Sequence, residues 1–141
     1  MYDNPSGLIV AVSKAAGRRL RNDRSKDCFL MQKGCYILNH WGFGPIYSFK
    51  HYVDGPFSSE LAEDCEEIHD FGTDTTVPEE AIRNLSDILS KGVRFTEAYA
   101  TLLLAKHVNP GVSNEIVVGK VLEVEPRLKK EVYEAAPLVL P

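Results

Sequence analysis

The stretch TEAYATLLLA, residues 96–105, predicts the central helix of a mainly α-helical fold. Thr96 belongs to the residue types that cap helix N-termini, because its hydroxyl can accept a hydrogen bond from a free backbone N–H group. The sequence Asn-Pro-Gly at 109–111 is a strong stop signal for the same helix. The apolar side chains that we expect in the middle of the core are Tyr99, Leu102, Leu103 and Ala105.

Apolar residues at helical spacing predict six further helices around this one. Ser25 and Ser58 are suitable N-caps, and Thr76 with Glu79 three residues later has the pattern of a capping box. The valines within 113–124 leave a strand as the alternative for that segment. We expect the six helices at 6–20, at 25–41, from Ser58, from Thr76 to Gly92, at 113–124 and at 128–135.

A short β element is predicted around residues 46–53, where aromatic and β-branched residues follow the break Gly-Phe-Gly-Pro at 42–45. Residues 54–58 then form a turn that leads into the next helix. We expect a compact single domain over residues 1–141, with a core from about residue 6 to residue 136 and a frayed C-terminal tail.

The composition is that of an ordinary globular protein, with 44% hydrophobic and 26% charged residues among 141. The longest apolar runs fall far short of the roughly 20 residues of a membrane-spanning helix, and the N-terminus lacks the pattern of a secretory signal. Cys28, Cys35 and Cys65 are odd in number and form no Cys-x-x-Cys pair, so we expect reduced thiols. These observations predict a soluble, cytoplasmic protein with no membrane partner.

The charges are unevenly distributed, and the acidic part lies between Asp54 and Glu80, where there is no Lys or Arg. Helical spacing places these carboxylates on the outer surface of the helix that begins at Ser58. Such a surface suits a basic protein partner, because complementary charge speeds encounter and selects partners. The alternative is a merely solvated face. The predicted partner-binding residues are Glu60, Glu63, Asp64, Glu67 and Asp70.

A basic cluster lies nearer the N-terminus and gives the alternative hypothesis of nucleic-acid binding. Arginine side chains that neutralise phosphates release counterions, which gives affinity that depends on salt. A solvated helix end explains the same residues without any ligand. The candidate nucleic-acid contacts are Arg18, Arg19, Arg21 and Arg24.

No catalytic residue, metal ligand or cofactor site is predicted. Cys65 and His69 are four residues apart on one helix, but the surrounding carboxylates would raise the pKa of the thiol and disfavour a reactive thiolate. The four histidines lack the spacing of a metal site, and there is no glycine-rich phosphate loop. The chemistry of the residues therefore favours a binding protein over an enzyme.

Four stretches in order resemble the Panacea-type antitoxin domain and its YwgA-like relatives, over residues 25–138. LMQKGCY at 30–36 is similar to the family's LQKLxY helix, and FKHYVDGPFSSEL at 49–61 resembles its F-x-x-Y-x-x-GPFS-x-x-L signature. TEAYAT at 96–101 and the segment 124–135 resemble the two later motifs. The residues that match the first two motifs are Gln32, Lys33, Tyr36, Tyr52, Gly55, Pro56, Phe57 and Ser58.

The resemblance implies a helical domain with a small β element and no catalytic activity. Met31, Gly34 and Cys35 depart from the family's helix, and Pro126 lacks the preceding Lys. Panacea-type antitoxins neutralise toxins by direct binding, so we expect a protein–protein interaction, with a toxin as the partner, in a toxin–antitoxin system or a related regulator. The alternative is a DNA-binding transcriptional regulator that uses the basic cluster.

Overall fold

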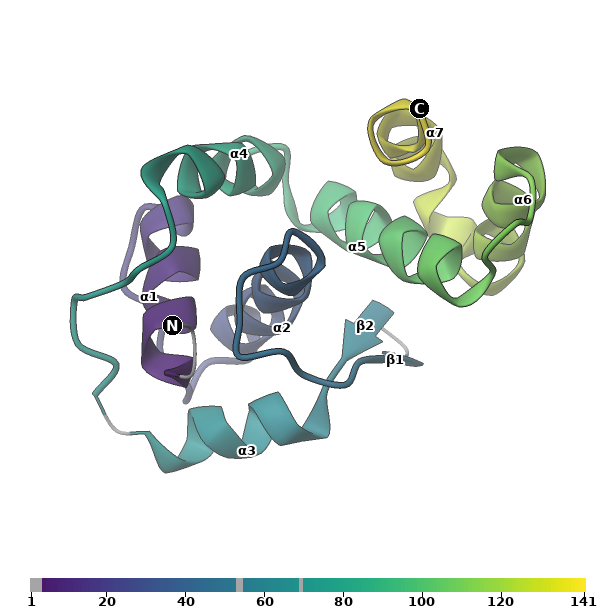
Figure 1. The fold of residues 1–141 in the computed structure, drawn as a ribbon. Coiled ribbons are helices and arrows are strands. Elements are labelled where there is room, and N and C mark those ends of the chain that lie inside the picture. Colours follow the sequence, from purple (N-terminus) through teal and green to yellow (C-terminus); the bar gives the residue numbers. More distant parts are fainter. Residues whose placement is uncertain (1–3, 53–54, 69) are drawn as a thin grey trace.

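The structure, a computed structural model, describes residues 4–52, 55–68 and 70–141 (Figure 1). In these ranges the chain forms seven α-helices, one short 3-10 helix and two short strands, which confirms the mainly α fold. The elements are α1 Pro5–Ala16, α2 Ser25–His40, β1 Lys50–Tyr52, β2 Gly55–Phe57, α3 Ser59–Glu67, α4 Glu79–Leu89, α5 Val93–Val108, α6 Asn114–Val124, η1 Pro126–Leu128 and α7 Lys129–Val139.

Helix α5 lies at the centre, between α1, α2 and α4 on one side and α6 and α7 on the other (Figure 1). All ten of its residues from 95 to 104 are buried, so the predicted central helix is confirmed. Ala105, which was expected in the middle of the core, is only half-buried and packs against it. Its start was predicted wrongly, because α5 begins at Val93 and Gly92 is its N-cap. The hydroxyl of Thr96 instead donates to the carbonyl of Gly92, at 2.9 Å, inside the first turn.

Two of the predicted helix starts are confirmed by side-chain hydrogen bonds. The Oγ of Ser58 accepts from the backbone N–H of Leu61, and the Oγ of Ser113 accepts from that of Ile116. Residues 114–124 are therefore helix and not strand. Each hydroxyl satisfies one of the N–H groups that a helix leaves unbonded in its first turn.

Other predicted helix boundaries were wrong, and the backbone explains why. Ser25 lies within α2, whose N-cap is Arg24, and α4 begins at Glu79 after Pro78 rather than at Thr76. Helix α1 ends at Ala16, not at residue 20, because Gly17 takes the left-handed conformation (φ +74°) that closes a helix.

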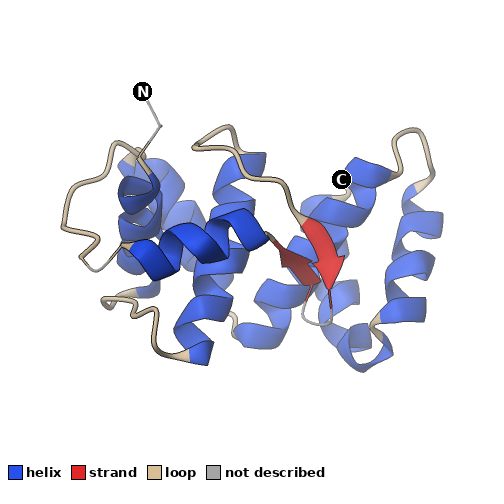
Figure 2. Cartoon of the chain, turned by 90° about the horizontal axis from the view of Figure 1, so that it is seen from below, coloured by secondary structure: helices blue, strands red, loops and turns tan. Residues whose placement is uncertain are grey.

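The β element is a two-stranded antiparallel hairpin that lies against the middle of the helical assembly (Figure 2). Lys50 pairs with Phe57 and Tyr52 with Gly55. The predicted strand at 46–53 was too long, since β1 starts at Lys50, and the described part of the predicted turn at 54–58 contains β2. Val53 and Asp54 lie outside the described residues.

The C-terminal segment is ordered, contrary to the frayed tail that the sequence predicted. Helix α7 runs to Val139 although Pro137 lies inside it. Leu140 is buried against the core, and its carbonyl accepts from Nδ2 of Asn114 at 3.4 Å. The predicted core limit at residue 136 was therefore too short.

Buried side chains from every helix form one hydrophobic cluster. Helices α1 and α2 come close together at Gly34, where an added Cβ would lie 2.6 Å from Cγ1 of Val12. This contact explains a glycine in the middle of α2. None of the described helices combines the length and the apolar character of a membrane-spanning segment.

Candidate functional site

The first two stretches of the family resemblance meet in space, between α2 and β2. Nε2 of Gln32 donates to the carbonyl of Ser58 at 2.9 Å, and Oε1 of Gln32 accepts from the N–H of Ser58 at 2.8 Å. Nζ of Lys33 donates to the carbonyl of Pro56 at 2.8 Å. Because these groups are buried, the hydrogen bonds replace those that water would otherwise supply. The two stretches are thus the two halves of one contact.

The remaining motif residues position the hairpin and the start of α3. Gly55 has φ +93°, and a Cβ there would lie 2.7 Å from Oγ1 of Thr101, so this position requires glycine. The ring of Tyr36 packs edge-on against Phe49, and burial raises the pKa of its hydroxyl. Most of the motif is therefore interior structure, with Tyr52, 52% exposed, as the clear exception.

The third and fourth stretches of the resemblance also meet, at an ion-pair network that our reading of the charges missed. Glu97 on α5 and Glu125 before η1 are both buried, and Arg127 pairs with both of them. Nε2 of His51 lies 3.6 Å from Oε1 of Glu125. The sequence shows the charged residues in each stretch, but it does not show that they pair, because Glu97 and Arg127 are 30 residues apart.

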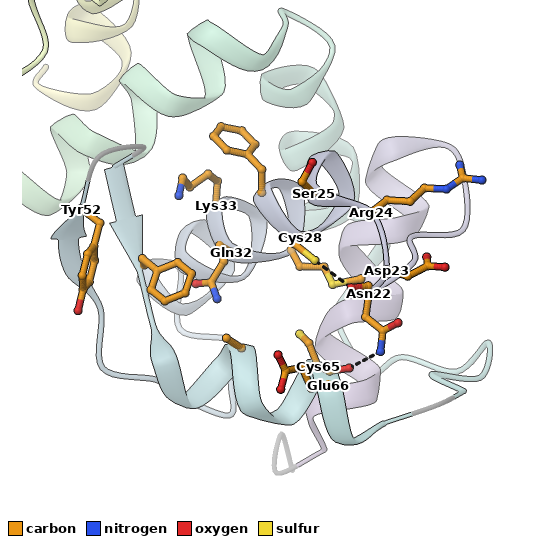
Figure 3. A pocket seen from close by; sticks show the side chains of 14 residues that line it. Asn22, Asp23, Arg24, Ser25, Cys28, Gln32, Lys33, Tyr52, Cys65 and Glu66 are labelled. Atoms are coloured by element: carbon orange, nitrogen blue, oxygen red, sulfur yellow. Dashed lines mark hydrogen bonds between the residues drawn. The ribbon is translucent and has the colours of Figure 1, made fainter.

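A cavity of about 630 Å³ opens beside the first of these contacts, between α2, α3, the hairpin and the loop before α2 (Figure 3). We call it the α2–α3 groove. One end of it is closed by Asn22, whose Nδ2 donates to the carbonyl of Cys65 at 2.8 Å and whose own carbonyl accepts from Sγ of Cys28. Its apolar lining comes mainly from Phe29, Met31, Tyr52, Phe57, Ala62 and Cys65.

Four of the five predicted partner-binding carboxylates lie on α3, as the spacing predicted, whereas Asp70 lies outside it because α3 ends at Glu67. The surroundings of the five residues differ. Glu60, Glu63 and Glu67 are exposed. Asp64 is half-buried and accepts a hydrogen bond from the hydroxyl of Tyr47 at 2.6 Å, while Asp70 forms an ion pair with Arg19. Two of the five predicted partner-binding carboxylates thus bond to the chain's own side chains.

Glu66 was left out of the predicted partner-binding residues, although it is exposed and lines the α2–α3 groove (Figure 3). Its charge was visible in the sequence. Its place beside an apolar cavity was not, because the groove forms only when α2 and α3 pack together.

The basic cluster is largely paired with carboxylates. Arg18 lies 2.6 Å from Asp27, Arg19 lies 2.7 Å from Asp70, and Arg21 makes two bonds to Asp23. Arg24 is exposed and precedes α2. Because three of the four predicted phosphate contacts have a carboxylate partner, the positive charge available to a nucleic acid is reduced.

Asp27 is the buried member of this cluster, with its side chain 2% exposed. Burial alone would raise the pKa of its carboxyl group. The hydrogen bond from the N–H of Arg21 and the ion pair with Arg18 outweigh burial, so the pKa of Asp27 is lowered. Asp27 therefore keeps its charge inside the fold and holds the loop before α2 in place.

The cysteine thiols are in surroundings that disfavour reactivity. Burial first, and then the nearby Cys28 and Asp64, raise the pKa of Cys65 to about 12. Burial likewise raises the pKa of Cys35 and of Cys28. His69, the partner considered for Cys65, lies outside the described residues. In the part of the chain that the structure describes, no three His, Cys, Asp or Glu side chains gather as metal ligands would.

Comparisons of the chain with protein-family models, curated proteins and solved structures found no match. Two kinds of surface stand out together: the exposed carboxylates of α3 and the apolar groove at the side of the same helix.

Proposed function

We propose that this chain is a non-catalytic domain that forms a stoichiometric complex with a protein partner through α3, as an antitoxin or an antitoxin-like regulator. The observation that carries the proposal is how the side chains of α3 are divided between the core and the solvent. Within this fully described helix only Leu61 and Cys65 are buried, while four glutamates are exposed to solvent. These glutamates are Glu60, Glu63, Glu66 and Glu67.

Such a row of like charges does not help the helix to form. Glu63 and Glu67 are four residues apart, and like charges at that spacing destabilise a helix by about 0.2–0.5 kcal/mol. Neither Lys nor Arg occurs within α3 to compensate them. A basic partner would supply the opposite charges, and its approach would be accelerated by the field of the helix.

A toxin that acts on nucleic acid fits this description of the partner, because it needs a basic surface for its own substrate. Carboxylates along α3 can occupy that surface in place of phosphates. The resemblance to Panacea-type antitoxins supports the same class of partner.

The state of the thiols supports a role without catalysis. With its pKa raised to about 12, Cys65 carries a proton at neutral pH, and a protonated thiol is a poor nucleophile. The three free cysteines also fit a reducing compartment, which is why we propose a cytoplasmic location.

The test is affinity purification of the tagged chain from its own host, comparing wild type with the triple variant E63K/E66K/E67K. We leave Asp64 unchanged because its hydrogen bond to Tyr47 belongs to the fold. The matched control is D87K/E123K/E134K, which makes the same change of net charge at exposed helical positions outside α3. We expect one stoichiometric partner that is lost in the α3 variant and kept in the control.

The antitoxin role needs a second measurement on the same partner. Expressed alone, the partner should arrest growth, and co-expression of the wild-type chain, but not of E63K/E66K/E67K, should restore it. Recovery of nucleic acid alone, or of a partner that both triple variants retain equally, would refute the proposal.

A further inference from the structure

The α2–α3 groove has the size and lining of a binding site. Its volume of about 630 Å³ lies within the roughly 300–1,000 Å³ of typical ligand clefts, which are mostly apolar with a few polar groups at fixed places. Among its lining residues, Met31 and Cys65 are buried and Phe57 is half-buried. An open, apolar space of this kind gains stability when another apolar group fills it.

An exposed aromatic ring forms one lip of the groove. Tyr52 is 52% exposed, and its ring is held edge-on to Phe57 with the ring centres 5.3 Å apart. Figure 3 shows Tyr52 at the end of the groove opposite Asn22 and Asp23. A rigid aromatic side chain at the edge of a pocket can bury a large area at little cost in conformational entropy.

The charged side chains around the groove differ from one side to the other. On the loop side, Asp23 is paired with Arg21, and Arg24 is exposed. At the inner side, Nζ of Lys33 bonds to the carbonyl of Pro56 and lies 4.9 Å from the ring centre of Phe29. On the α3 side the charged lining residue is Glu66, and Glu63 and Glu67 lie on the same helix outside the lining.

We infer that the α2–α3 groove binds a segment of the protein partner that inserts an aromatic or aliphatic side chain and carries Lys or Arg beside it. The apolar lining would hold the inserted side chain, and the α3 glutamates would contact the flanking cations. This inference rests on the proposed function and adds to it the anchoring site and the chemistry of the partner's segment. Buried anchors of this kind account for most of the binding energy in protein interfaces.

The probe is a library of random short peptides displayed on phage and selected on the immobilised full chain. We expect the selected peptides to combine an aromatic or branched aliphatic residue with nearby Lys or Arg. Their affinity is then measured with Ala62→Trp, which fills the groove, and with Ser59→Trp, which adds the same ring at an exposed position of α3 outside the lining. We expect Ala62→Trp to weaken binding about tenfold or more and Ser59→Trp to leave it unchanged.

Two further measurements protect the test against a variant that fails to fold. Tyr52→Ser removes the exposed ring at the lip together with its edge-on contact with Phe57, and it should also weaken binding. In wild type, bound peptide should slow maleimide alkylation of Cys28, which is partly exposed and lines the groove. Unchanged alkylation of Cys28, or unchanged affinity in both Tyr52→Ser and a folded Ala62→Trp, would overturn the inference.

The variant E63K/E66K/E67K separates this inference from the proposed function. Peptides that lose affinity in this variant but bind Ala62→Trp normally would overturn the groove and leave the acidic surface standing. A second outcome would be peptides that lack basic residues and whose affinity falls in Ala62→Trp but not in the glutamate variant. This outcome would overturn the proposed Lys or Arg in the partner's segment, and with it the proposed contact through the α3 glutamates. Selection of no peptide at all would overturn the groove as a peptide site.

Discussion

Helices α5 and α3 differ in how much of their surface is buried. In α5 ten consecutive residues are buried and contacts reach most of the other helices, whereas the nine residues of α3 bury two side chains and expose four glutamates. Helix α5 has 16 residues and α3 has nine, and both pack on the same core. The difference teaches where to look for each property: substitutions in α5 should change the free energy of unfolding, and substitutions on the outer face of α3 should change binding.

The largest expected effect is from Leu102→Ala in α5, where the side chain is fully buried. Removing it leaves a cavity, and we expect a loss of about 2–5 kcal/mol in the free energy of unfolding. Glu63→Ala on α3 should change that quantity by less than about 0.5 kcal/mol. Urea titration followed by circular dichroism measures both. Equal effects of the two substitutions on the free energy of unfolding would contradict the assignment of stability to α5 and of binding to α3.

The next effect concerns the contact that attaches α3 to the core. Gln32→Ala removes both hydrogen bonds to Ser58 and leaves a buried N–H and a buried carbonyl without these partners. At about 1–3 kcal/mol for each of the two buried groups left unbonded, we expect a loss of about 2–6 kcal/mol.

Thermal unfolding should show this loss against the control Asn84→Ala, which shortens an exposed amide on α4. A change no larger than that of the control would mean that the Gln32 contact does not stabilise the fold.

Helices α5 and α3 also show how much of the structure could be predicted from the sequence. The centre of α5 and the acidic surface of α3 follow from periodicity, and Ser58 was identified as a cap from its residue type. The bond between Gln32 and Ser58 could not be derived from spacing, because it joins positions 26 residues apart.

The site was less predictable than the fold, for a physical reason. Which acidic side chains remain exposed depends on partners from distant segments, such as Tyr47 for Asp64 and Arg19 for Asp70. The groove depends on how two helices pack, and no local pattern encodes it. Gly92 led to a wrong boundary for α4, since it precedes α5 as its N-cap instead of ending α4.

Asp27 offers an intermediate case, a carboxylate that is buried where those of α3 are exposed. Its folded pKa is lowered, so its contribution to stability is present above the unfolded value of about 3.9 and is lost as the pH falls through the folded pKa. Asp27→Asn should lose about 1.5–3 kcal/mol at neutral pH, the range for hydrogen bonds to charged groups.

The difference between wild type and Asp27→Asn should begin to shrink below about pH 4, where the carboxylate gains a proton in the unfolded chain, and should be smallest below the lowered pKa of the folded state. Urea titrations at a series of pH values test this, with Glu63→Gln as an exposed control. A difference that stays constant down to low pH would contradict the assigned role of the Asp27 charge.

The smallest expected effect on stability is from the exposed pair between Arg19 and Asp70, whose side chains are 69% and 74% exposed. Arg19→Gln should change the free energy of unfolding by no more than about 0.5 kcal/mol, because solvent screens such pairs. Thermal unfolding at low and high salt measures it. A larger, salt-dependent loss would show that this link between the basic cluster and the segment after α3 is structural.

The nucleic-acid alternative is tested on the same arginines. Because Arg18, Arg19 and Arg21 are paired with carboxylates, we expect no retarded DNA band in a gel shift at low salt. A band that weakens as salt is raised, and that is lost in Arg24→Gln, would favour the DNA-binding regulator instead.

The close approach of α1 and α2 at Gly34 has a consequence for the evolution of this chain. Since a Cβ at position 34 would overlap with Val12, the two positions are constrained as a pair. Among descendants of a common ancestor, a larger residue at 34 should be accompanied by a smaller one at 12, and this covariation should be visible in the sequences alone. The double variant Gly34→Ala with Val12→Ala would recover part of the stability that Gly34→Ala loses, and would retrace such an evolutionary path in two steps.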